Sequence, residues 1–159
     1  MNLEASKKTL KVVGIIEIAL GVLVYLVGIL AAIGGSFIAI GVYGDNIPAL
    51  NTFVAQGLSA QQLGSFATLG AVLFILIGTI GTIEGVLYVR GANNFAKITP
   101  AWIFSIIGLI ISAYLIYVTA MSIINHTATI ATVITNVLEI SISILVFIAA
   151  NSIRNATKK

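Results

Sequence analysis

The sequence has no cysteine, one histidine and few charges, and each shortage excludes a class of protein. Without cysteine there is no disulfide framework, no thiolate metal site and no cysteine nucleophile. His126 alone is too little for a histidine-based zinc site. Charged residues make up 8% of the chain and hydrophobic residues 59%, whereas soluble domains carry about 25% charged residues. The solvent of this chain is therefore expected to be lipid.

Four apolar segments follow one another along the chain, at residues 12–40, 65–89, 100–124 and 129–153. Each is long enough to cross the hydrocarbon core as a helix, which takes about 20 residues. The largest connection, residues 41–64, separates the first two segments. The sequence therefore predicts an all-α integral membrane protein with one domain, residues 1–159, built as an up-down bundle of four transmembrane helices.

All eight lysines and arginines lie outside these segments, in three clusters. The clusters precede the first segment, separate the second from the third, and follow the fourth: Lys7, Lys8, Lys11, Arg90, Lys97, Arg154, Lys158 and Lys159. With four crossings the three clusters share one face, and the positive-inside rule makes that face cytoplasmic. We therefore expect a multi-pass protein with both termini cytoplasmic, in a cell membrane and specifically a bacterial cytoplasmic membrane.

Four spans, two inner termini and a larger first outer connection resemble the topology of claudin-like tetraspan proteins. That family carries a tryptophan and paired cysteines in its first outer connection. Here cysteine is absent and the one tryptophan, Trp102, lies at the inner start of the third segment. The resemblance therefore covers helix count and loop order, and it transfers no residue role and no function.

The outer connection 41–64 contains three local signals. Asp45 and Asn46 with Pro48 indicate a turn. Ser59 and Gln62 have the spacing of a capping box, which predicts that the second helix starts slightly before the membrane. The stretch between them, residues 47–58, is mildly amphipathic, and we expect it either to lie on the outer membrane surface or to form a short lid on the bundle.

Each segment carries a stripe of small or hydroxylated residues with a period of 3.5 residues, the seam of a left-handed helix pair. In lipid, small residues let helix backbones approach, and hydroxyls hydrogen-bond across the interface. The glycines expected to pack are Gly14, Gly21, Gly28 and Gly35 in the first segment and Gly78, Gly81 and Gly85 in the second.

Three of the five acidic residues interrupt the membrane segments. Glu17 lies six residues after Lys11, and Glu84 lies six residues before Arg90, so both are expected at a similar depth near the basic face. Glu139 is expected alone, near the bilayer centre. Such carboxyls either join helices by hydrogen bonds or mark an ion pathway. Because no lysine or arginine lies at its depth, Glu139 should be protonated, or should face water or a cation.

The fourth segment places polar side chains on the face of Glu139, and they continue toward the outer side but not toward the inner side. This helix alone therefore supplies half of a pathway. The candidate intramembrane polar or ion-binding residues are Glu139, Asn136, Thr132, Ser143, Glu17 and Glu84.

The sequence shows no catalytic constellation, no glycine-rich phosphate loop and no metal-binding set, so we expect neither an enzyme nor a cofactor. The short basic clusters suit lipid headgroups, and nucleic acid is not expected as a partner. The leading hypothesis is function through helix association, as a homo-oligomer or as an accessory subunit of a membrane complex. The alternative is a small cation or proton channel or transporter that uses Glu139, with Glu17 and Glu84 at its inner mouth.

Overall fold

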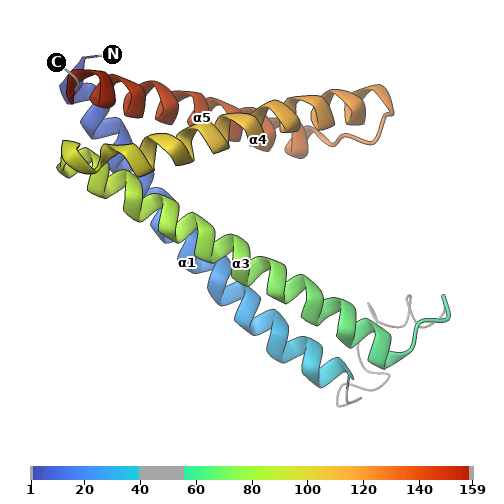
Figure 1. Cartoon of the computed structure of the whole chain (residues 1–159). Helices are drawn as coiled ribbons and strands as arrows, with labels where there is room; N and C mark the ends of the chain where they lie inside the picture. Colours follow the sequence, from blue (N-terminus) through green and yellow to red (C-terminus); the bar gives the residue numbers. More distant parts are fainter. Residues whose placement is uncertain (1, 40–55, 158–159) are drawn as a thin grey trace. The chain divides into compact units, whose positions relative to one another are not determined.

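The computed structural model describes residues 2–39 and 56–157, and every regular element in these two ranges is helical. The described chain contains four long helices, α1 (Leu3–Ala39), α3 (Ala60–Asn93), α4 (Ile98–Ile124) and α5 (Ile130–Thr157), with the short 3-10 helix η2 (Phe95–Lys97) between α3 and α4 (Figure 1). All four are long and apolar enough to span a membrane. The prediction of an all-helical protein with four such spans is thereby confirmed for the described chain.

The helices extend beyond the apolar segments from which they were predicted. Helix α1 begins at Leu3 rather than at residue 12, and α3 runs from Ala60 to Asn93 rather than from 65 to 89. Hydropathy marks only the apolar part of a helix, whereas backbone hydrogen bonding continues into polar turns. Residues 40–55 lie outside the described ranges, and with them the turn at Asp45 and most of the amphipathic stretch.

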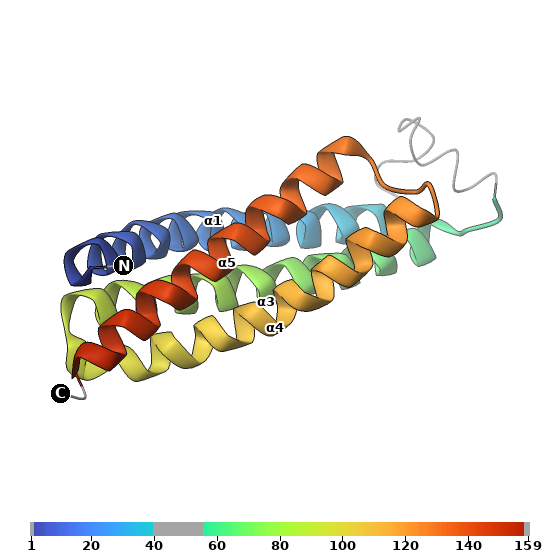
Figure 2. The same ribbon diagram turned by 90° about the horizontal axis from the view of Figure 1, so that it is seen from above.

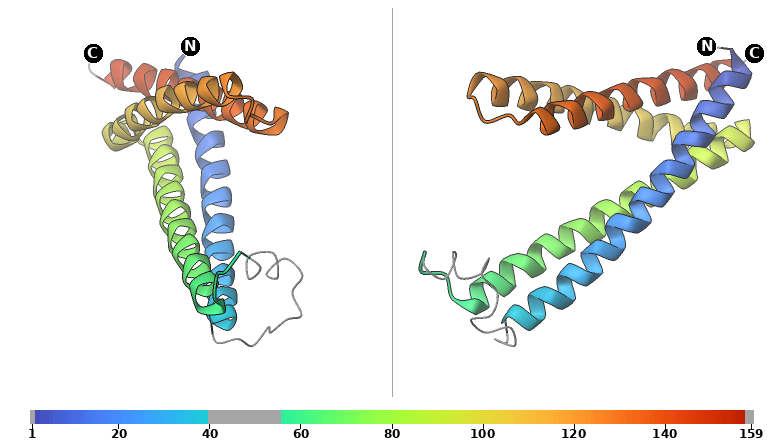
Figure 3. Two further views of the ribbon diagram at one scale, coloured as in Figure 1. Left: turned by 90° about the vertical axis from the view of Figure 1, so that its right-hand side faces the viewer. Right: turned by 180° about the vertical axis from the view of Figure 1, so that it is seen from behind.

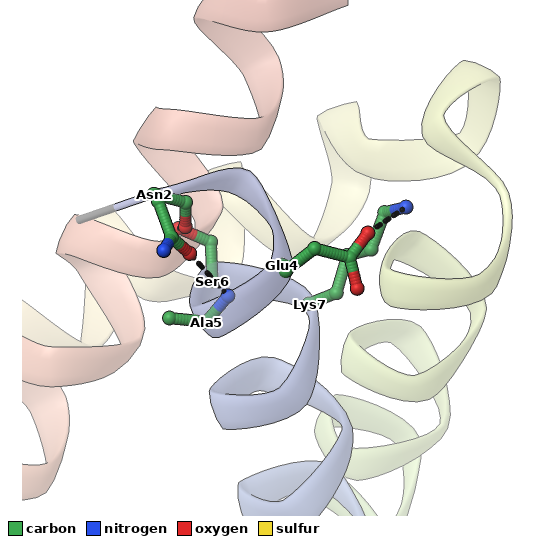
Figure 4. Close-up of polar contacts among 5 residues, drawn as sticks. All are labelled: Asn2, Glu4, Ala5, Ser6 and Lys7. Atoms are coloured by element: carbon green, nitrogen blue, oxygen red, sulfur yellow. Dashed lines mark hydrogen bonds and ion pairs between the residues drawn. The ribbon is translucent and has the colours of Figure 1, made fainter.

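Helix α3 begins with the predicted capping box, which is confirmed. The backbone N–H of Gln62 donates to Ser59 Oγ at 3.2 Å, and the backbone N–H of Ser59 donates to Gln62 Oε1 at 2.8 Å. These reciprocal bonds satisfy two N–H groups that have no partner within the helix. The start of α1 is capped similarly, because Asn2 Oδ1 accepts the Ala5 N–H at 2.8 Å (Figure 4).

The chain divides into two compact units, which are described separately. Unit 1 comprises Met1–Ile18 and Ile83–Lys159, and unit 2 comprises Ala19–Thr82. Unit 2 therefore contains the second half of α1 and the first part of α3. Unit 1 contains the other ends of these two helices together with η2, α4 and α5.

In unit 2, α1 and α3 lie side by side and run in opposite directions (Figure 3). Their backbones touch where Gly21 meets Gly78. A Cβ atom on Gly78 would lie 2.5 Å from the backbone nitrogen of Tyr25 and 2.6 Å from the carbonyl oxygen of Gly21. Gly28 and Gly35 make similar contacts with α3. The glycine stripes of the two helices therefore face each other within one chain.

In unit 1, α4 and α5 form a hairpin that turns at Asn125 and His126 (Figure 2). His126 is exposed and has a positive φ of 55°. The amide of Asn136 on α5 donates to Thr119 Oγ1 on α4 at 2.6 Å. The core of the unit draws on all four long helices through Leu10, Tyr88, Ala92, Ile98, Ala101, Val146, Ala149, Ala150 and Ile153.

Candidate functional site

Unit 1 contains a small polar cavity within the candidate membrane spans. Its volume is about 30 Å³, and a water molecule needs roughly 10–15 Å³ of such space. Residues from α1, α3, α4 and α5 line it: Glu17, Glu84, Tyr88, Ser105, Gly108, Ile142, Ser143 and Val146. Three of the predicted site residues, Glu17, Glu84 and Ser143, therefore meet at one place.

A glycine contact brings the helices of Glu17 and Glu84 together. A Cβ atom on Gly85 would lie 2.5 Å from the carbonyl oxygen of Gly14 and 2.7 Å from the backbone nitrogen of Ile18. The two backbones therefore touch beside both glutamates. Gly14 and Gly85, both predicted to pack, thus make this contact, and Gly81, also predicted to pack, is half-buried.

Glu84 is held by a neighbour on its own helix. The phenol of Tyr88 donates a hydrogen bond to Glu84 Oε1, and Tyr88 is only 3% exposed. Sequence reasoning did not assign Tyr88 to the site. The sequence contained a signal for Tyr88, because Tyr88 lies four residues after Glu84 and residues four apart share one face of a helix. The bond fixes one carboxyl oxygen of Glu84 and leaves the other for the cavity.

Ser105 and Ser143 line the same cavity as Glu17 and Glu84. Ser105 on α4 is buried, and its hydroxyl donates to the carbonyl oxygen of Trp102 at 2.7 Å. The donor of Ser105 is thus occupied, and its oxygen remains an acceptor. The site accordingly combines two acids with at least one neutral acceptor, a suitable set for holding a proton or a bound water molecule.

Glu139 is also close to this site, although it does not line the cavity. Glu139 lies one turn before Ser143 on the same face of α5, and Ser143 lines the cavity. Counting residues along separate helices had placed Glu139 apart from the other two. Such a count measures how far each residue lies from the end of its own helix. It does not measure how far one helix is shifted along its axis relative to another.

The polar stripe at the start of α5 contains internal hydrogen bonds. Thr129 and Thr132 share a hydrogen bond of 2.7 Å between their hydroxyls, and Asn136 is bound to α4. Glu139 is exposed. Among the residues that the structure describes, no hydrogen bond or ion pair to its carboxyl is found. Glu139 is therefore an exposed acidic group on α5 without a partner among the described residues.

Where the polar stripe of α5 ends, polar residues of other helices line the same cavity. Beyond Ser143, α5 continues with the apolar residue Val146, as its sequence indicated. Beside Val146 the cavity wall is formed by Glu17 from α1 and by Glu84 and Tyr88 from α3. The polar lining of the cavity is thus contributed by α1 and α3 as well as by α5.

A metal centre does not form in the described part of the chain. Over residues 2–39 and 56–157, no three histidine or acidic side chains come close enough together to hold a metal ion. Within these ranges the three glutamates therefore do not form a cage of metal ligands.

Comparisons with protein-family models, with curated proteins and with solved structures give no match to this chain. The fold and the site nevertheless define a class: a small helical protein with four candidate membrane spans and a carboxyl-lined cavity within them.

Proposed function

We propose that this protein transfers protons across its membrane, with Glu17, Glu84 and Glu139 as the groups that carry them. The supporting observation is the cavity in which carboxyls from α1 and α3 meet hydroxyls from α4 and α5. Ionisable residues within membrane spans characteristically form proton relays or ion pathways. The transfer needs neither a cofactor nor a catalytic nucleophile, and we do not regard the protein as an enzyme.

The size of the cavity favours a proton over a metal ion. About 30 Å³ admits one or two water molecules, and hydrated metal ions are larger. A desolvated ion would need several oxygen ligands at short distances. Carboxyls that interact through a water molecule can instead pass a proton without closing around it.

The proposed topology has four crossings in up-down order with both termini cytoplasmic. In its support, Leu10 of α1, Ala92 of α3 and Ile153 of α5 share one core. The basic clusters adjoining these residues in sequence then border one end of unit 1, as the positive-inside rule requires. Protons would enter from the outer side near Thr132 and Glu139 and leave past Glu17 and Glu84. A bacterial cytoplasmic membrane, which maintains a proton gradient, is the expected location.

The direct test is proton flux into proteoliposomes that contain a pH-sensitive dye, driven by a potassium gradient with valinomycin. The wild-type protein should carry flux well above protein-free liposomes. Glu139→Gln should slow it about tenfold, because glutamine cannot release a proton. Ser141→Ala is the matched control, since Ser141 is exposed on the same helix and its hydroxyl only bonds the Val137 carbonyl. Wild-type flux at the protein-free level would refute the proposal.

A second function, association with another membrane subunit or a second copy, is supported by the surface of α5. Glu139 is exposed together with Thr132 and Thr135, and polar groups in lipid gain from a polar partner. Because the glycine stripes of α1 and α3 contact each other, association would depend on α5. Native mass spectrometry in mild detergent should then show an oligomer that Glu139→Leu disrupts. A monomer without any partner would contradict this function.

A further inference from the structure

A second cavity lies where the first helix passes the connection between α3 and α4, entirely within unit 1. It is an open pocket at the surface rather than an enclosed one, and its volume is about 410 Å³. We call it the Lys7 cavity, and its lining is Lys7, Ala92, Asn93, Asn94, Phe95 and Ala96.

The ammonium group of Lys7 is held in position by two contacts. It forms an ion pair of 3.1 Å with Glu4 Oε1, one turn earlier on α1 (Figure 4), and it lies 4.7 Å from the centre of the Phe95 ring. The Glu4 side chain is 85% exposed, whereas that of Lys7 is 34% exposed. The carboxyl of Glu4 can therefore rotate into solvent while Lys7 remains at the cavity with hydrogen-bond donors to spare.

The other polar lining groups also favour an anion. Asn94 Oδ1 accepts the backbone N–H of Ala96 at 3.1 Å. The side-chain NH₂ group of Asn94 is not used in that bond and remains a donor. The side chain of Asn93 is exposed and has no hydrogen bond to the described chain. One ammonium and two amides thus offer donors, and the carboxylate of Glu4 is the acidic group that an anion would displace from Lys7.

The location of the cavity indicates where its ligand comes from. One candidate membrane span ends at Asn93 and the next begins at Phe95. The lining residues therefore lie where an apolar span gives way to the headgroup region. Arg90 and Lys97 flank them in sequence and add positive charge. Basic pockets at this level between membrane helices are typical sites for anionic lipid headgroups.

We propose that the Lys7 cavity binds the phosphate group of an anionic phospholipid headgroup. Lys7 pairs with the phosphate, and the amides of Asn93 and Asn94 donate to its oxygens. The acyl chains extend along the apolar surface of the neighbouring helices. This site is separate from the glutamate cavity and does not depend on proton transfer.

The test is binding of phosphatidylglycerol to the full-length protein in detergent, measured by native mass spectrometry against phosphatidylcholine with the same acyl chains. Phosphatidylglycerol should bind at least about tenfold more tightly. Lys7→Gln should weaken it about tenfold or more, because a charge-assisted hydrogen bond is lost. Lys8→Gln removes the same charge from an exposed residue that does not line the cavity, and it should cost at most about fivefold.

Two further measurements keep the result interpretable. Glu4→Gln removes the competing carboxylate and should tighten phosphatidylglycerol binding, while circular dichroism verifies that each variant remains helical. Equal losses in Lys7→Gln and Lys8→Gln would overturn the proposal, since diffuse charge alone would then explain the binding. Displacement of the lipid by millimolar inorganic phosphate would also overturn it, because free phosphate would then be the ligand.

Discussion

Replacing Gly78 by leucine should force α1 and α3 apart in unit 2 and destabilise the protein severely. The Cβ atom of any larger residue would lie 2.5 Å from the backbone nitrogen of Tyr25 and 2.6 Å from the carbonyl oxygen of Gly21. Backbone atoms cannot yield by changing rotamer, so the helices themselves must move. The loss of stability should exceed the ~1–3 kcal/mol that is usual for an over-packed core. Thermal unfolding of the purified protein in detergent measures it.

Gly70 provides the matched control on the same helix. A Cβ atom at this position would meet no other atom within 4 Å. Gly70→Leu should therefore unfold at or above the wild-type temperature, since leucine also favours the helix more than glycine does. Equal unfolding temperatures for Gly78→Leu and Gly70→Leu would show that the α1–α3 contact does not stabilise the protein.

Glu84→Gln should reduce proton flux at least tenfold while leaving the fold intact. Glutamine has nearly the shape of glutamate and keeps an oxygen that can accept the hydrogen bond of Tyr88. Glutamine cannot take up and release a proton in the pH range in which a carboxyl does. The variant therefore separates the chemical role of the carboxyl from its role in packing. Flux in proteoliposomes and unfolding temperature in detergent should be measured on the same preparation.

Thr79→Val is a suitable control on α3. Thr79 is exposed, and its hydroxyl bonds only the carbonyl oxygen of Ile75 one turn earlier. This change should leave both flux and stability near wild type. If Glu84→Gln carried normal flux, Glu84 would not be part of the pathway. If it lost flux and unfolded at a much lower temperature, Glu84 would be a structural residue of the α1–α3 pair.

The sequence by itself was sufficient for those features that depend on one helix at a time. Low charge and four long apolar segments predict four membrane spans, because each helix meets the cost of entering lipid through its own residues. The capping box at Ser59 and Gln62 was equally predictable, since both of its hydrogen bonds join residues three apart. The helix ends were less predictable, because a helix can continue into polar turns that hydropathy does not mark.

Only the tertiary structure determined which polar groups share a site. Periodicity identified Glu17, Glu84 and Ser143 on separate helices, and the polar surface along α5 ended at Val146. The contact of Gly14 with Gly85 brings the helices of Glu17 and Glu84 together, and the packing of α5 places Ser143, one turn from Glu139, on the same cavity. Helix register depends on the fit of whole surfaces in three dimensions. The residue pattern of one helix does not specify how its surface fits the surface of another helix. The cavity is therefore visible only in the packed structure.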